Sequence, residues 1–288
     1  MSAPAERPRK LGIAAGSGPL PLQLAEAARA SGRDVFIVGV KGAAGSSIEA
    51  WPHGWVRVGA MGRFLKLFRE AGCEDIVIIG PMTRPTLRDI VPDFRGLLLL
   101  PRFIKRMQRG DDALLRGVVE FLEDNGLRVI GAETILTSLL AAEGLFTRIA
   151  PDAAHQADID LAIRAAHDIG AQDIGQGAVA RQGHVIALED IQGTDVMLTR
   201  VAAKTPHAAS TRQGVLVKLP KPAQDRRVDR PTIGARTVER AAAAGLAGIA
   251  VEAGGAIIAD AEEMTRIANA LGLFVLGFPP SRVESLVR

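Results

Sequence analysis

The order of secondary-structure signals in the first half of the chain restricts the fold more than any other feature. Short apolar runs alternate with longer segments in which apolar residues recur at helical spacing. The strand-like runs lie at 11–15, 34–40, 76–79 and 128–130, and the helix-like segments at 21–30, 61–71 and 112–123. Strands that alternate with helices in this way predict an α/β fold with an open, mostly parallel, Rossmann-like sheet.

The pattern changes after about residue 132. A helix is expected at 153–169, and the alternating segment 178–188 is typical of a hairpin because Arg181-Gln-Gly-His184 interrupts it. Further strands are expected at 196–201, 215–218, 248–251 and 274–276, and helices near 237–244 and 261–271. We therefore predict a Rossmann-like N-terminal domain over 1–132, a linker over 133–150 and a mixed α/β C-terminal catalytic domain over 151–288.

Composition excludes several classes of protein. The chain has 288 residues, 48% of them hydrophobic, which is enough to form the cores of two domains. A single cysteine, Cys73, excludes an intrachain disulfide and a cysteine-based zinc site. A net charge of +3 with 4% aromatic residues does not favour nucleic-acid binding. No apolar run approaches the ~20 residues of a membrane span, and residues 1–10 lack the apolar core of a secretory signal, so a cytoplasmic location is expected.

Two glycine-containing loops follow predicted strands of the first half. In GIAAGSGPLP (12–21), Gly16 and Gly18 would let backbone N–H groups approach a phosphate, although a simple tight connection explains the same glycines. The loop does not match the dinucleotide fingerprint, because Pro21 replaces the third glycine. In IIGPMTRP (78–85), Gly80 and the residues after it could line the same cleft or form an ordinary loop stiffened by proline.

The stretch from Phe94 to Arg109 mixes large apolar residues with arginine and lysine. Such a mixture can lie on an anionic membrane or flank an acyl chain. A packed helix with a solvated basic face is the alternative.

Two segments of the second half gather charged residues. In ALEDIQGTDVML (187–198), Glu189, Asp190 and Asp195 surround one turn and would suit Mg²⁺, or they are simply solvated. From Pro220 to Asp229 apolar periodicity disappears inside an otherwise structured domain, and long polar loops of this kind are often functional. Its Lys and Arg residues could neutralise a pyrophosphate while a carboxylate holds a metal or orients water; a flexible surface loop is the alternative.

Together, GIAAGSGPLP, IIGPMTRP, EDIQGTDVML, KLPKPAQDRRVDRPTIGARTV and GLAGIAVEAGGAII resemble the LpxI family of UDP-2,3-diacylglucosamine pyrophosphatases. The motifs occur in the family's order over nearly the whole chain. The resemblance implies hydrolysis of UDP-2,3-diacylglucosamine to 2,3-diacylglucosamine 1-phosphate (lipid X) and UMP, a step of lipid A biosynthesis. It also implies Mg²⁺ as cofactor and a lipid substrate held between the two domains.

The resemblance also assigns roles to residues. Asp225 and Asp229 match the carboxylates of the QDxRxD-like motif, and Asp225 takes the essential role of holding Mg²⁺ or positioning water. Asp190 and Asp195 are expected as further metal ligands. Ser17 stands where the family often has glycine. The expected substrate-binding residues are Gly16, Ser17, Gly18, Gly80, Met82, Thr83, Glu189, Thr194, Lys218, Gln224, Arg236, Thr237 and Gly254.

Two other functions remain open at this point. A nicotinamide-dependent oxidoreductase would share the N-terminal fold, although Lys41 stands where an acid should grip a ribose. A non-catalytic lipid or nucleotide carrier would bind without turnover.

For the pyrophosphatase, the expected partner is a UDP-linked diacylated sugar lipid, with peripheral contact to the cytoplasmic face of the inner membrane.

Overall fold

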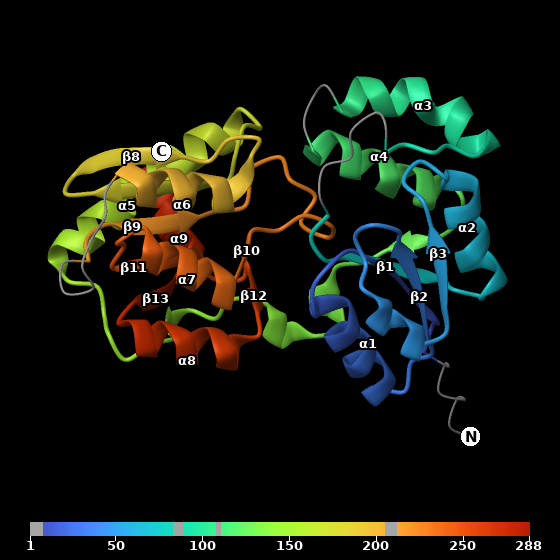
Figure 1. The fold of residues 1–288 in the computed structure, drawn as a ribbon, viewed down its shortest axis with the longest axis horizontal. Helices are drawn as coiled ribbons and strands as arrows, with labels where there is room; N and C mark the ends of the chain where they lie inside the picture. Colours follow the sequence, from blue (N-terminus) through green and yellow to red (C-terminus); the bar gives the residue numbers. More distant parts are fainter. Residues whose placement is uncertain (1–7, 83–88, 108–110, 205–211) are drawn as a thin grey trace. The chain divides into compact units, whose positions relative to one another are not determined.

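The computed structural model describes residues 8–82, 89–107, 111–204 and 212–288. These residues form two compact units (Figure 1). The first contains the chain up to Thr137 together with Arg227–Asp229, and the second contains Ser138–Arg226 and Arg230–Arg288. The domain limits predicted from the sequence, including the linker over 133–150, stay predictions. Along the described residues, no helix has the length and apolar character needed to cross a membrane.

A five-stranded sheet organises the first unit. Its order is β3-β2-β1-β4-β5, and every neighbouring pair is parallel, which confirms the predicted parallel sheet. The chain moves outward from β1 on one side and from β4 on the other, so the two strands flank a topological switch point. The strands are β1 (Leu11–Ala15), β2 (Val35–Val40), β3 (His53–Val56), β4 (Asp75–Ile79) and β5 (Arg128–Val129).

Helices cover both faces of this sheet. Ala14, Val38 and Ile76 pack with Phe68 of α2 and Leu122 of α4 in one buried cluster. Alternate strand residues point to the opposite face, where α1 packs against β1 and β2. The helices are α1 (Leu20–Ala30), α2 (Met61–Glu70), α3 (Phe94–Met107) and α4 (Asp111–Asp124), with short 3₁₀ turns at η1 (Ser46–Ala50), η2 (Ala132–Thr134) and η3 (Thr137–Leu139).

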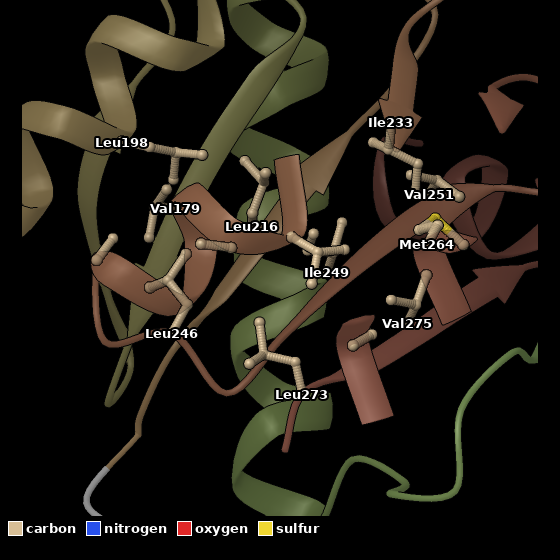
Figure 2. Close-up of a cluster of buried hydrophobic side chains, with 14 of the residues drawn as sticks. Val179, Leu198, Leu216, Ile233, Leu246, Ile249, Val251, Met264, Leu273 and Val275 are labelled. Carbon is tan, nitrogen blue, oxygen red and sulfur yellow. The ribbon is translucent and has the colours of Figure 1, made fainter. Parts of the chain in front are cut away.

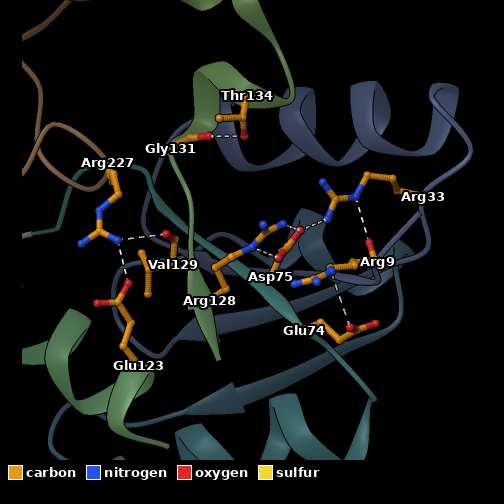
Figure 3. A network of polar contacts seen from close by, with 10 residues as sticks. All are labelled: Arg9, Arg33, Glu74, Asp75, Glu123, Arg128, Val129, Gly131, Thr134 and Arg227. Carbon is orange, nitrogen blue, oxygen red and sulfur yellow. Dashed lines mark hydrogen bonds and ion pairs between the residues drawn. The ribbon is translucent and has the colours of Figure 1, made fainter. Parts of the chain in front are cut away.

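A buried carboxylate ties three strands of the sheet at their amino ends (Figure 3). Asp75, the first residue of β4, is 1% exposed. It accepts hydrogen bonds from Arg33 Nη2 at 2.6 Å and from Arg128 Nε and Nη2 at 2.7 and 2.9 Å. Burial alone would raise the pKa of Asp75, but the hydrogen bonds and charges of Arg128 and Arg33 outweigh it and hold the pKa below its ordinary value.

A six-stranded mixed sheet forms the second unit, which confirms the predicted mixed α/β fold. Its order is β6-β13-β11-β9-β7-β8. β9, β11 and β13 are parallel, whereas β7 runs antiparallel to β8 and β9. A separate parallel pair joins β10 (Thr232–Gly234) to β12 (Ile257–Ala259). The sheet strands are β6 (Gly144–Leu145), β7 (Gly177–Arg181), β8 (His184–Leu188), β9 (Val215–Lys218), β11 (Gly248–Glu252) and β13 (Phe274–Phe278).

Strand alternation sends two sets of apolar side chains to the two faces of this sheet. Leu216 and Ile249 join the cluster shown in Figure 2, with Leu198 of α6 and Met264 of α8. Their neighbours, such as Val217, belong to a second buried cluster with α5. The helices are α5 (Ala153–Ala171), α6 (Gly193–Lys204), α7 (Ala235–Ala243), α8 (Ala261–Leu271) and α9 (Pro280–Leu286).

One predicted element has the wrong type. Residues 196–201 were expected to form a strand, but they lie inside α6. The buried residues of this helix are Met197, Leu198 and Val201, which share one helical face and do not alternate. The β-branched residues Val196 and Val201 favour a strand locally, and packing against the sheet overrides that preference.

We expect Asp75→Asn to lower the free energy of unfolding of the first unit by about 3 kcal/mol, because the Arg33 guanidinium, whose side chain is only 14% exposed, would lose its anionic partner. Urea denaturation followed by circular dichroism measures it. Because the folded-state pKa is depressed, the contribution of Asp75 is present above about pH 4 and is lost as the pH falls through that pKa.

Glu70→Gln is the matched control for this experiment. Glu70 pairs with Lys66 at 3.5 Å on the surface, with side chains 62% and 70% exposed. Its loss should change stability by less than ~0.5 kcal/mol. An Asp75→Asn effect no larger than this would show that the buried network does not hold the strands.

Candidate functional site

The two glycine loops of the first unit meet at the carboxyl ends of β1 and β4. Gly16 N donates to Ile79 O at 2.9 Å, and Ser17 N donates to Pro81 O at 2.8 Å. A side chain at Gly16 would collide with the Gly80 carbonyl, and one at Gly80 would lie 2.7 Å from Ser17 O. The glycines therefore permit close backbone packing, and the first two amides bond within the protein instead of pointing at a ligand.

Other predicted residues of these loops are surface positions. Gly18 adopts a positive φ of 84° with open space where a side chain would stand, as expected for a turn that remains accessible. Met82 is 43% exposed. Thr83 lies outside the described residues.

Charged and polar side chains gather at one edge of the second unit's sheet, where β8, β9 and β11 end. Lys218 is the last residue of β9 and Glu252 the last of β11, while Glu189 directly follows β8. All three are buried, and so is Gln224 in the loop after β9. Burial of charge requires compensating partners, so a concentration of this kind at strand ends marks a candidate site.

Glu189 and Lys218 occupy the α6 side of this edge. The Thr194 hydroxyl donates to Glu189 Oε2 at 2.7 Å, and Lys218 Nζ contacts Thr232 O at 3.5 Å. A side chain at Gly177 would lie 2.6 Å from Glu189 Oε2. The lack of a side chain at the start of β7 therefore makes room for this carboxylate beside β9.

The loop from Leu219 to Pro231 is anchored near α5 at its beginning. Lys221 Nζ donates to Asp173 Oδ1 at 2.6 Å. The Lys221 backbone N–H donates to Gln224 Oε1 at 3.0 Å, and Gln224 Nε2 donates to Gln176 Oε1 at 3.5 Å. These contacts hold the residue immediately before Asp225.

The turn after β11 anchors the rest of the same loop. Arg226 Nη1 lies 3.5 Å from Glu252 Oε1, and Arg230 Nη1 donates to Gly254 O at 2.8 Å. Asp225 is partly buried and lies between the anchored Gln224 and Arg226. The loop predicted as either a phosphate site or a flexible surface segment is thus held by specific contacts on both sides of its carboxylate.

Residues 227–229 of the loop belong to the first unit. Arg227 Nη1 donates to Glu123 Oε1 at 2.7 Å and to Val129 O at 3.2 Å (Figure 3). Val228 packs against the buried cluster between the sheet and α2. Asp229, the alternative carboxylate, follows directly.

Glu252 belongs to this candidate site but was not among the residues predicted from the sequence. Burial raises the pKa of Glu252 above its ordinary value, and the nearby charges of Arg226 and Arg230 only partly offset this. The signal was present in the sequence, since a carboxylate ends the otherwise apolar strand GIAVE, every residue of which is buried. A buried acid at the end of a parallel strand indicates a ligand-binding edge of the sheet more specifically than the glycines that follow it.

The predicted metal ligands Asp190 and Asp195 are engaged by arginines. Asp190 accepts from Arg200 Nη1 at 2.7 Å and from Gln192 N at 2.8 Å, which lowers its pKa. Asp195 lies 2.7 Å from Arg236 Nη2 and 3.2 Å from Arg240 Nε, in the first turn of α6. Among the described residues, no group of three or more His, Cys, Asp or Glu side chains could hold a metal ion.

A magnesium ion in this protein would therefore depend on few protein ligands. Mg²⁺ usually keeps several waters and is bound by one or two carboxylates together with substrate phosphates. Asp225 is a partly buried acid on an anchored loop. Asp190 and Asp195 would have to exchange arginine partners for the metal.

The remaining predicted residues lie around the same strand ends. Arg236 and Thr237 belong to the first turn of α7, and the Arg236 side chain is 71% exposed. Gly254 has a φ of 68° and donates its N–H to Ala141 O at 2.8 Å. Thus the second unit places Glu189, Thr194, Lys218 and Gln224 at one edge, and Arg236 is exposed nearby in α7.

Comparison with known proteins supports the resemblance over almost the whole chain. Residues 10–139 match the LpxI N-terminal domain family, and residues 142–276 match the LpxI C-terminal domain family. The UDP-2,3-diacylglucosamine pyrophosphatase LpxI of Caulobacter vibrioides is 44% identical over 276 residues, which cover 94% of this chain and 98% of that protein.

A solved structure shows only remote likeness. The biotin carboxylase domain dimer of the Hydrogenobacter thermophilus 2-oxoglutarate carboxylase aligns with 68% of this chain and 40% of its own, at 12% identity and a TM-score of 0.25. The two domain matches and the Caulobacter vibrioides relative, in contrast, cover nearly the whole chain, and the chain belongs to the LpxI family.

Proposed function

We propose that this protein hydrolyses the pyrophosphate of UDP-2,3-diacylglucosamine to 2,3-diacylglucosamine 1-phosphate and UMP, a step of lipid A biosynthesis in the cytoplasm. The observation that carries the proposal is 44% identity over 94% of the chain to a protein named for this pyrophosphatase activity. The cluster of buried charge at the strand ends of the second unit supports it. In this proposal residues of both units hold the substrate.

Lys218 is the residue best suited to bind the pyrophosphate. It is 5% exposed, and a buried ammonium group requires a nearby negative charge or several acceptors. Its ammonium group contacts the carbonyl oxygen of Thr232, and a phosphate oxygen would supply the required negative charge. Arg236, largely exposed at the start of α7, would offset charge on the outer phosphate.

Asp225 is proposed to orient the attacking water or to hold Mg²⁺ with the phosphate oxygens. When bound, the metal would neutralise charge that develops on the oxygens in the transition state. The contacts of Gln224 and Arg226 would keep the carboxylate in place while the phosphorus–oxygen bond breaks and UMP leaves. A carboxylate that is already in position needs no free energy of reorganisation during the reaction.

We expect Asp225→Asn to reduce the rate of UMP release by at least ~10²-fold, because positioned acid–base groups contribute 10²–10⁴-fold. Substrate binding and the circular dichroism spectrum should be retained. Asp229→Asn serves as the comparison, since the proposal assigns the essential role to Asp225. A normal rate in Asp225→Asn, or a larger loss in Asp229→Asn, would contradict the assignment.

The metal is tested by measuring UMP release with and without EDTA. We expect EDTA to abolish the activity and added Mg²⁺ to restore it, because charge on the pyrophosphate would otherwise be uncompensated. Cleavage that persists in EDTA would refute the metal. Tight substrate binding with no UMP at any Mg²⁺ concentration would instead identify a carrier.

A further variant tests the buried carboxylate of Glu252. Its raised pKa means that a stabilising contribution is present below the unfolded-state value near 4.5 and is lost as the pH rises through the folded-state pKa. Glu252→Gln should therefore be as stable as the wild type or more stable at pH 8, yet slower in UMP release, because Arg226 loses its anionic partner. Urea denaturation at pH 5 and pH 8, with an activity profile over the same range, measures both effects.

Glu239→Gln provides the control, because Glu239 is exposed on α7. It should change neither stability nor rate. If Glu252→Gln instead retained full activity, Glu252 would have no part in positioning the Asp225 loop.

A further inference from the structure

The first turns of α3 expose large apolar side chains. Phe94 is 77% exposed, Leu98 66% and Leu97 57%, and their spacing puts Phe94, Leu97 and Leu98 on one face of the helix. Val91, just before the helix, is 44% exposed. Single exposed apolar residues are ordinary, whereas a contiguous group of this size marks an interaction surface. We call these four residues the α3 apolar face.

The α3 apolar face is held rigidly by its own unit. The Asp93 carboxylate accepts hydrogen bonds from Gly96 N at 2.8 Å, Gly62 N at 3.1 Å and Arg63 N at 2.7 Å, so it joins the starts of α2 and α3. A side chain at Gly96 would collide with the Gly59 carbonyl, which shows how closely the two backbones approach. α3 packs against α2 and α4 (Figure 1), and Phe94, Leu97 and Leu98 remain exposed.

A basic pocket adjoins the α3 apolar face. It has a volume of about 370 Å³ and is lined by Lys41, Trp55, Arg57, Arg63, Val91 and Asp93, among others. Val91 belongs to both features. Lys41, Arg57 and Arg63 are exposed cations, whereas the one carboxylate lining the pocket among these residues, Asp93, already accepts three backbone N–H groups. The pocket is therefore suited to an anion.

We propose that this face docks onto an anionic phospholipid bilayer, with Phe94, Leu97 and Leu98 inserted among the acyl chains and a lipid phosphate in the pocket between Lys41, Arg57 and Arg63. Charge complementarity selects this partner. Exposed Arg95 lies beside the inserted side chains, and the three cations of the pocket are exposed as well. Apolar residues flanked by cations bind the interface of anionic membranes in this way.

The inference rests on the proposed function, since a diacylated substrate has to be taken from a membrane. Binding to a bilayer is measured without turnover, so the two proposals are tested separately. The test is flotation with vesicles of phosphatidylethanolamine and phosphatidylglycerol, compared with phosphatidylcholine alone. We expect the protein to float with the anionic vesicles and to be released by high salt. No binding to the anionic vesicles would overturn the proposal.

Two pairs of variants separate the two parts of the surface. Phe94→Ser with Leu98→Ser should weaken vesicle binding at least tenfold, whereas Ile191→Ser, 67% exposed on the second unit, should not change it. Lys41→Gln with Arg57→Gln should weaken binding to anionic vesicles about 25-fold, at roughly fivefold for each of the two cations near the surface. Lys66→Gln, with a side chain 70% exposed, is the control.

Turnover in detergent micelles distinguishes this proposal from the proposed function. All these variants should release UMP at the wild-type rate when the substrate is dispersed in micelles. If Phe94→Ser with Leu98→Ser bound vesicles normally but lost micellar turnover, the face would be a substrate subsite. If the same variant changed the mass in solution from dimer to monomer, it would be a subunit interface. Either outcome would overturn bilayer docking, whereas absent UMP release with normal vesicle binding would overturn only the proposed function.

Discussion

Helices cover both faces of each sheet, so polar side chains find few places along the strands except at their ends. In the first unit β1 is buried at every position, and in the second unit β7, β9 and β11 are as well. Asp75 and Arg128 stand at the amino ends of their strands and hold the sheet together. Lys218 and Glu252 stand at carboxyl ends, where parallel sheets bind ligands. The ion-pair network that holds the sheet of the first unit and the candidate site of the second unit thus stand at opposite ends of their strands.

The two kinds of buried acid show this separation in their pKa values. Asp75 has arginine partners that outweigh its burial, and its pKa is lowered. Glu252 is not fully compensated by Arg226 and Arg230, and its pKa is raised. A protein retains an under-compensated buried carboxylate at a cost in stability, which is common at sites where function requires it. The cost is consistent with a role of Glu252 in holding the loop that carries Asp225.

The Asp225 loop combines irregular backbone with fixed position. Its prolines and charged residues prevent a helix or a strand, and contacts from Lys221, Gln224, Arg226 and Arg230 replace regular hydrogen bonding. The same principle applies at α3, where Asp93 and Gly96 fix the helix start so that apolar side chains stay exposed. In both places a short polar or glycine anchor fixes the position of a segment that carries a proposed function.

The sequence by itself determined the α/β class, the parallel sheet and the family. Hydrophobic periodicity is a property of short segments, and the order of motifs follows from the chain itself, so neither depends on tertiary contacts. It did not reveal β3, whose His53 and Gly54 carry little strand signal, and it assigned a strand to residues of α6. Only the tertiary structure decided that Asp190 and Asp195 pair with arginines, that the Gly16 and Ser17 amides bond within the protein, and that Glu252 is buried close to Arg226. Those outcomes depend on contacts between residues far apart in the chain, such as Arg236 with Asp195, which no local pattern encodes.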